Sequence, residues 1–124
     1  MKHKILIVDD ASFKINVLAD LLKPTFKIMA AINGLHALKA ARSENPPDLI
    51  LLDIMLPELD GYEVCRQLKE DESTREITII FVTAMGQEAD EKMGLELGAA
   101  DYITKPISPA IVEARVRTQI ERKQ

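Results

Sequence analysis

Five polar residues in this sequence could act together on a metal ion or a phosphoryl group, because they lie at the ends of short apolar runs. Such runs are typical of strands buried on both faces, and here they occupy residues 5–8, 49–52, 79–82 and 102–104. The polar residues are Asp9, Asp10, Asp53, Thr83 and Lys105. Ligands of an open parallel sheet bind beyond the carboxyl ends of its strands, so these side chains are expected to meet at one edge.

Three carboxylates at one edge repel one another unless a cation lies between them. Hard oxygen ligands favour Mg²⁺, or Mn²⁺, over zinc. Asp53 is the central carboxylate and could attack phosphorus to give an aspartyl phosphate. The Thr83 hydroxyl and the Lys105 ammonium group could contact the phosphoryl oxygens.

Each acid also has a purely structural interpretation. Asp9 and Asp10 could cap a helix, and Asp53 could be a turn residue. For any one of them alone this interpretation is the simpler, but their joint position at strand ends favours a shared site.

The composition of the 124-residue chain is that of one globular domain, with 47% hydrophobic and 29% charged residues. The net charge of −4 argues against general affinity for nucleic acid. Cys65 is the only cysteine, so no disulfide framework is expected. No apolar stretch reaches the roughly 18 residues of a membrane span. Residues 1–4 lead into a strand without a signal peptide, so we expect a cytoplasmic protein.

The chain alternates apolar strands with amphipathic segments, which predicts βαβ units around a parallel sheet. The predicted strands are Lys4–Val8, Phe26–Ala31, Leu49–Leu52, Thr78–Val82 and Asp101–Thr104. The predicted helices are Ser12–Leu22, Leu35–Ser43, Gly61–Lys69, Gln87–Leu97 and Pro109–Lys123. The predicted fold is therefore α/β, a flavodoxin-like doubly wound five-stranded parallel sheet of order 2-1-3-4-5 with five helices.

Apolar residues at helical spacing indicate which helix faces pack on the sheet. In the first helix they are Phe13, Val17, Leu18, Leu21 and Leu22. In the last helix they are Ile111, Val112, Val116 and Ile120. The apolar stripe of the last helix is also compatible with a dimer surface.

The joint spacing of several short motifs resembles one known family. The motifs are Asp9-Asp10, Asp53 followed by Pro57 and Gly61, Thr83-Ala84, and Lys105-Pro106. Over essentially the whole chain, residues 1–124, they resemble the receiver domain of bacterial two-component response regulators.

The resemblance implies that Asp53 accepts a phosphoryl group from a sensor histidine kinase or a phosphotransfer protein. It implies a Mg²⁺ site made by Asp10, Asp53 and the backbone carbonyl of Met55, with Asp9 acting through water. The phosphoryl oxygens would be contacted by Thr83, Ala84 and Lys105. No enzymatic activity is implied beyond self-phosphotransfer and self-dephosphorylation.

Two further features follow from the resemblance. The peptide bond between Lys105 and Pro106 is commonly cis in the family. Tyr102 matches an aromatic switch residue that turns inward when Thr83 is drawn to the phosphate.

The resemblance also implies partners. Asp101 and Arg115 match an acid–base pair that crosses the interface of receivers that dimerise through the segments predicted here at 87–97, 101–104 and 109–123. Ile111 stands where those receivers often carry an acid. The last helix resembles the segment that continues into output domains, so the chain is either a stand-alone receiver or part of a longer protein. We expect no direct binding of nucleic acid or membrane.

Two other classes of protein remain open on the residues alone. A phosphatase of the haloacid dehalogenase type would need a second acid two residues after Asp53, where Met55 stands. A flavodoxin-like cofactor binder would need a phosphate-binding loop where Asp9 and Asp10 would repel the phosphate. If the chain is a receiver, the apolar side chains of Met55 and Met85 predict slow self-dephosphorylation, because neither can orient a water molecule.

Overall fold

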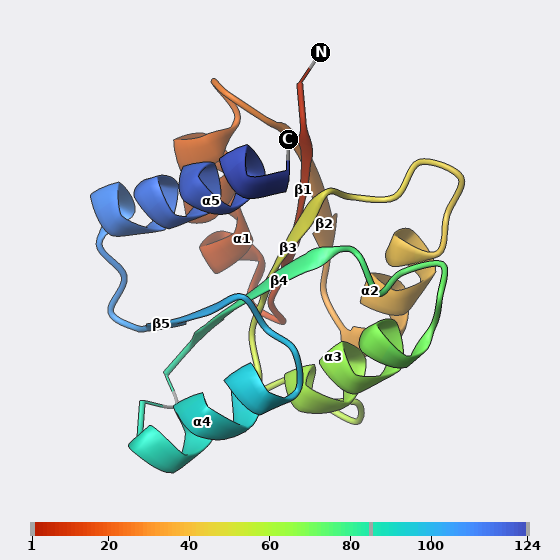
Figure 1. Cartoon of the computed structure of the whole chain (residues 1–124). Coiled ribbons are helices and arrows are strands. Elements are labelled where there is room, and N and C mark those ends of the chain that lie inside the picture. Colours follow the sequence, from red (N-terminus) through yellow and green to blue (C-terminus); the bar gives the residue numbers. More distant parts are fainter. Residues whose placement is uncertain (1, 85, 124) are drawn as a thin grey trace.

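The computed structural model describes residues 2–84 and 86–123 of the chain. Its centre is a five-stranded parallel sheet in the order β2-β1-β3-β4-β5, as predicted (Figure 1). The strands are β1 Lys4–Val8, β2 Lys27–Ala31, β3 Leu49–Leu52, β4 Thr78–Thr83 and β5 Asp101–Thr104. The helices are α1 Ser12–Leu22, α2 Gly34–Ala41, α3 Gly61–Glu70, α4 Glu88–Glu96 and α5 Pro109–Lys123.

The helices form a layer on each face of the sheet. Helices α1 and α5 cover one face, and α2, α3 and α4 cover the other (Figure 1). Side chains of each central strand alternate between the two layers: in β1, Ile5 and Ile7 face α1 and α5, whereas Leu6 and Val8 face the other layer. Burial on both faces explains why these strands read as unbroken apolar runs.

The predicted packing face of α1 is wrong in part. Phe13 and Val17 are 67% and 53% exposed, whereas Ile15, Leu18 and Leu22 are buried. The buried residues lie three and four positions apart and form one stripe, and Phe13 and Val17 lie on the opposite side of the helix. In α5 the same geometry buries Val112, Val116 and Ile120 and leaves Ile111 45% exposed.

Several predicted boundaries are also wrong by one or two residues. Helix α2 begins at Gly34, because the Asn33 side chain accepts a hydrogen bond from the His36 N–H at 2.8 Å and caps the helix. It ends at Ala41, short of the predicted Ser43. Thr83 belongs to β4, and α4 lacks the predicted end residues Gln87 and Leu97. Strand β2 begins at Lys27 and α3 ends at Glu70, each one residue later than predicted.

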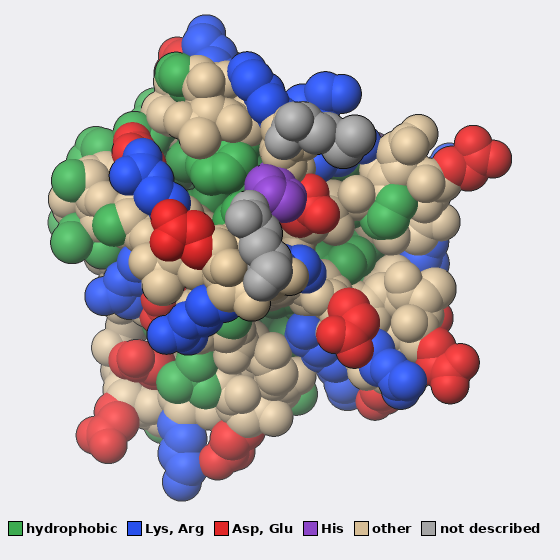
Figure 2. Space-filling model, turned by 45° about the horizontal axis from the view of Figure 1, so that its top comes forward, with side chains coloured by type: hydrophobic (Ala, Val, Ile, Leu, Met, Phe, Trp, Pro, Cys, Tyr) green, Lys and Arg blue, Asp and Glu red, His purple; other side chains and the backbone are tan. Residues whose placement is uncertain are grey.

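The outer surface carries both signs of charge. Figure 2 views the end of the sheet near the two termini, where acidic and basic side chains intermingle and hydrophobic side chains form small patches. Among residues 2–84 and 86–123, no helix combines the length and the apolarity that crossing a membrane requires.

Candidate functional site

The carboxyl ends of β1 and β3 place two of the predicted acids side by side. The strands are paired in register from Ile5 with Leu49 to Val8 with Leu52. The backbone pairing continues one residue further, because the Asp53 N–H donates to the Val8 carbonyl at 3.0 Å. Asp9 and Asp53 therefore leave neighbouring strands at the same edge.

Asp9, Asp10 and Asp53 form the acidic cluster of the site. One carboxylate oxygen from each lies within 4.8 Å of the other two. Asp9 and Asp53 are only 3% and 6% exposed, whereas Asp10 is exposed. Backbone N–H groups bind the second oxygen of each buried acid: Ala11 donates to Asp9 Oδ1 at 3.0 Å, and Met55 donates to Asp53 Oδ1 at 3.2 Å. These bonds leave Oδ2 of each buried acid for other partners.

Lys105 reaches into the acidic cluster from the end of β5. Its Nζ lies 3.1 Å from Asp9 Oδ2 and 3.3 Å from Asp53 Oδ2. Burial by itself disfavours the charged ammonium group, but the bonds and charges of the two acids outweigh it and raise the pKa of Lys105 above its ordinary value. The Lys105 N–H donates to the Thr83 carbonyl at 2.8 Å, and the Lys105–Pro106 peptide is cis.

Thr83 ends β4, the strand beside β3, and is fully buried. Ala84 follows it and is exposed. The structure thus places Thr83, Ala84 and Lys105 on the same edge of the sheet as the acidic cluster. Met85 lies outside the described residues, so the expectation for that side chain stays a prediction.

The loop from Asp53 to α3 closes tightly over the end of β3. The Gly61 N–H donates to the Ile54 carbonyl at 2.9 Å. A Cβ atom at Gly61 would lie 2.3 Å from the Asp53 carbonyl oxygen, so only glycine allows this approach. Glu58 adopts φ of 66°, a left-handed conformation. The Met55 side chain, two residues after Asp53, is 61% exposed.

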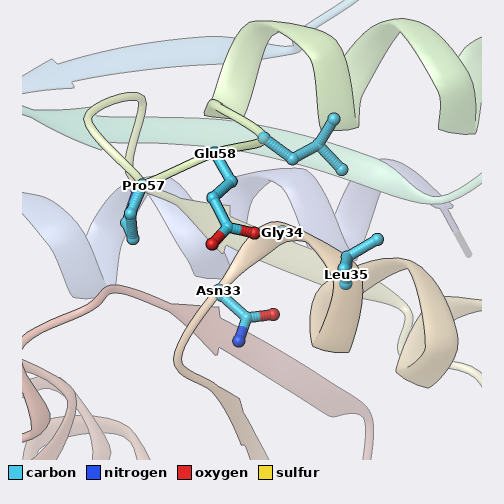
Figure 3. Close-up of a pocket in the computed structure, with 6 residues that line it drawn as sticks. Asn33, Gly34, Leu35, Pro57 and Glu58 are labelled. Atoms are coloured by element: carbon cyan, nitrogen blue, oxygen red, sulfur yellow. The ribbon is translucent and has the colours of Figure 1, made fainter.

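Hollows border this loop on more than one side, and two of them bear on the site. The first, of about 280 Å³, lies between the loop and the start of α2, and the Glu58 carboxylate points across it toward that helix (Figure 3). No residue of the acidic cluster lines it. The second, of about 440 Å³, is lined by Asp10 and Met55 among others and therefore adjoins the acidic cluster.

Tyr102 lies in β5 with only 4% of its surface exposed. Its hydroxyl lies beside the hydroxyl of Tyr62 in α3. Burial and the neighbouring Tyr62 raise the pKa of Tyr102 above its ordinary value. Sequence reasoning did not identify Tyr62; the only signal available was that Tyr62 and Tyr102 are the two tyrosines of the chain.

Asp101 and Arg115 pair within this chain. The guanidinium Nη1 of Arg115 lies 3.0 Å from Asp101 Oδ1, which also accepts the Tyr102 N–H at 2.8 Å. That the same two residues cross a dimer interface stays a prediction.

The donor set of the acidic cluster fits a divalent cation. Three carboxylates against the single ammonium group of Lys105 leave a net charge of −2 if all four are ionised. The ligands are hard oxygens, and the exposed side at Asp10 leaves room for water, which is the coordination that Mg²⁺ prefers.

Comparison with known proteins identifies relatives along nearly the whole chain. Residues 5–117 match the family model of the response regulator receiver domain. The chain is 45% identical to the alkaline phosphatase synthesis transcriptional regulatory protein PhoP of Bacillus subtilis, and the match covers 100% of this chain and 51% of that protein. The chain spans about half the length of this curated relative and about a quarter of others.

Solved structures show the same fold. The BeF3-activated receiver domain of DrrB, from Thermotoga maritima, is 33% identical with a TM-score of 0.88, covering 98% of this chain and 99% of that one. The receiver domain of the sensor histidine kinase PA1611 from Pseudomonas aeruginosa PAO1 is 29% identical with a TM-score of 0.83, covering 95% and 97% of the two chains. That structure has a magnesium ion coordinated in its active-site cleft.

Proposed function

The chain belongs to the response regulator receiver domain family of two-component systems, and on that premise we propose that Asp53 is its phosphoacceptor. The observation that carries the proposal is the convergence of Asp9, Asp10 and Lys105 on Asp53. This buried carboxylate lies in the middle of the sheet edge formed by the carboxyl ends of the strands. A buried acid beside a cationic group has the environment that a carboxylate nucleophile requires.

In the proposed step, a carboxylate oxygen of Asp53 attacks the phosphorus of a phosphohistidine. The new O–P bond forms as the P–N bond breaks, and the leaving imidazole nitrogen keeps the electron pair and takes a proton. The Thr83 hydroxyl, the backbone at Ala84 and the Lys105 ammonium group stabilise the charge on the phosphoryl oxygens. Histidine kinases make phosphohistidine from ATP, so this receiver would act in the cytoplasm.

A divalent cation completes the site in this proposal. Asp9, Asp10, Asp53 and the backbone carbonyl of Met55 would hold Mg²⁺, with Mn²⁺ as the alternative. The bound ion supplies charge neutralisation to the phosphoryl oxygens. The net charge of −2 left at the acidic cluster supports this assignment.

The proposed partners follow from the same role. The donor is a sensor histidine kinase or a phosphotransfer protein, and the chain itself catalyses only its own phosphotransfer and dephosphorylation. Because curated relatives are longer than this chain, a fused output domain is part of the proposal. The surface of α4, β5 and α5, which includes Asp101 and Arg115, is proposed to carry the signal to that domain or to a second copy.

Intact-mass analysis after treatment with acetyl phosphate and Mg²⁺ tests the assignment. We expect one phosphoryl group on the parent chain, none on Asp53→Asn, and none on the parent in excess EDTA. Asp20→Asn, which changes an exposed acid of α1, is the matched control and should be labelled like the parent. Labelling of Asp53→Asn at the parent's rate would overturn the proposal.

A further inference from the structure

Three aromatic rings form a cluster between the sheet and helices α3 and α4. Phe81 of β4 lies in the middle, fully buried. Its ring centroid is 5.6 Å from that of Tyr62, which meets it edge-on, and 6.0 Å from that of Tyr102. The cluster of Tyr62, Phe81 and Tyr102 therefore joins α3, β4 and β5.

The two tyrosine hydroxyls of this aromatic cluster form a relay. The Tyr62 hydroxyl donates to the backbone carbonyl of Asp90 in α4 at 3.0 Å. The Tyr102 hydroxyl lies beside the Tyr62 hydroxyl and is its neighbour on the β5 side. The relay runs from β5 through α3 to α4, and each hydroxyl has a partner.

Helix α4 buries few of its own side chains. Of its residues, Glu88–Glu96, only Gly94 is buried. A Cβ atom at Gly94 would lie 2.9 Å from a ring carbon of Phe81 and 3.1 Å from Cδ2 of Tyr102, so the α4 backbone rests directly on the rings. Met93 and Leu95 are 44% and 43% exposed and bury little apolar surface. The relay is thus a main attachment of the first turns of α4.

We propose that Tyr62 is a positioning residue, whose hydroxyl holds Tyr102 in its buried orientation and keeps α4 docked on the aromatic cluster. The bond from Tyr62 to Asp90 and the packing of the three rings carry this assignment without reference to phosphorylation. Its consequence for signalling rests on the proposed function: if Tyr102 is the switch partner of Thr83, Tyr62 sets the fraction of molecules that hold Tyr102 buried before any phosphoryl group arrives.

The substitution Tyr62→Phe tests the proposal, because it keeps the ring and removes only the hydroxyl. In protein with ¹³C-labelled tyrosine, the Tyr102 ring signal is assigned from the single remaining tyrosine. We expect its relaxation by a soluble paramagnetic agent to rise at least about twofold in Tyr62→Phe. We expect amide exchange in α4 to accelerate roughly fivefold, the effect of losing one net hydrogen bond.

Thr74→Val is the matched control. It also removes a buried hydroxyl, which donates to the Leu68 carbonyl at 2.8 Å, but it lies in the connection between α3 and β4. This variant should lose stability without changing the relaxation of Tyr102. A double variant, Tyr62→Phe with Tyr102→Phe, should accelerate α4 exchange less than the product of the two single effects, because both changes break one relay.

Two outcomes overturn the proposal. In the first, Tyr62→Phe changes neither the relaxation of the Tyr102 ring nor the amide exchange of α4. In the second, Thr74→Val changes both quantities as much as Tyr62→Phe does. The test is independent of phosphorylation, because the same Tyr62 dependence is expected in an Asp53→Asn background. If acetyl phosphate labels Asp53→Asn, the proposed function fails while the positioning role of Tyr62 stands.

Discussion

Among residues 2–84 and 86–123, Lys105 is the cation that pairs with the carboxylates of the acidic cluster, and its removal should be costly. The substitution Lys105→Met leaves two buried acids, Asp9 and Asp53, without their partner. We expect the free energy of unfolding in Mg²⁺-free buffer to fall by about 3 kcal/mol, as for other broken buried ion pairs. Added Mg²⁺ should recover part of the loss, which thermal unfolding with and without the ion measures.

Lys23→Met serves as the comparison for this prediction. Lys23 pairs with Asp20 on the surface of α1, where both side chains are largely exposed, so its removal should change stability little. Equal losses in the two variants would show that the ammonium group of Lys105 has no special role in the acidic cluster.

Cys65 makes stability depend on alkaline pH. Burial raises the pKa of its thiol from 9.0 to about 11. The unfolded chain therefore loses the thiol proton at a lower pH than the folded chain, and stability falls as pH rises between these two values. The contribution of this one group between pH 8 and pH 10.5 should be about 2 kcal/mol.

Urea denaturation of the parent and of Cys65→Ala at both pH values isolates that contribution. Other groups also titrate in this range, but they are present in both proteins. The variant should start less stable and lose about 2 kcal/mol less than the parent on raising the pH. An equal loss in both proteins would contradict the prediction.

At the scale of elements, the tight loop that joins β3 to α3, called the joint below, determines the position of Asp53. Gly61→Ala would bring a Cβ atom to 2.3 Å from the Asp53 carbonyl oxygen and 2.7 Å from the Ile54 Cα, and backbone atoms cannot turn away. Helix α3 must then move off the end of β3. We expect a loss of about 2 kcal/mol in stability and slower labelling by acetyl phosphate.

Gly86→Ala is the control for this joint. There a Cβ atom would meet the Cγ2 methyl of Thr104 at 2.6 Å, and that side chain can rotate. Its effect on both measurements should be smaller. Parental stability and parental labelling rate in Gly61→Ala would mean that the joint tolerates a side chain after all.

At the scale of the whole molecule, the two layers of helices share one sheet. The apolar cluster under α1 and α5 and the one under α2, α3 and α4 both include side chains of β1, β3, β4 and β5. Loss of either layer would expose the same strands, so we expect a single cooperative unfolding transition. Backbone circular dichroism and tyrosine fluorescence, which has no tryptophan background here, should give coincident transitions.

A ligand bound at the acidic cluster should therefore stabilise the entire chain. Beryllofluoride with Mg²⁺, a phosphoryl analogue, should raise the free energy of unfolding by about 2.7 kcal/mol at a hundredfold excess over its dissociation constant. Asp53→Asn should remove this gain. Separate transitions for the two probes would contradict a single cooperative domain. An equal gain in stability in Asp53→Asn would contradict binding of the ligand at Asp53.

The fold, and the set of residues at the carboxyl ends of the strands, could be predicted from the sequence because they depend on local patterns. An unbroken apolar run such as Leu49–Leu52 predicts a strand buried on both faces, and repeated alternation with helices predicts a parallel sheet. All parallel strands end at one edge, so the residues that follow β1, β3, β4 and β5 must meet there. Asp9 and Asp53 could be placed together without any knowledge of their contacts.

Only the tertiary structure decided which contacts those residues make. Lys105 binds Asp9 across 96 positions of sequence, and Tyr62 reaches Asp90 across 28. No periodic pattern reports such pairs, because they form when segments far apart in the sequence pack and each side chain takes the rotamer that its neighbours allow. The same reason explains the packing face of α1, where Ile15 is buried and Phe13 is exposed. A helical period shows that a face exists, but the shape of the sheet beneath decides which residues fill it.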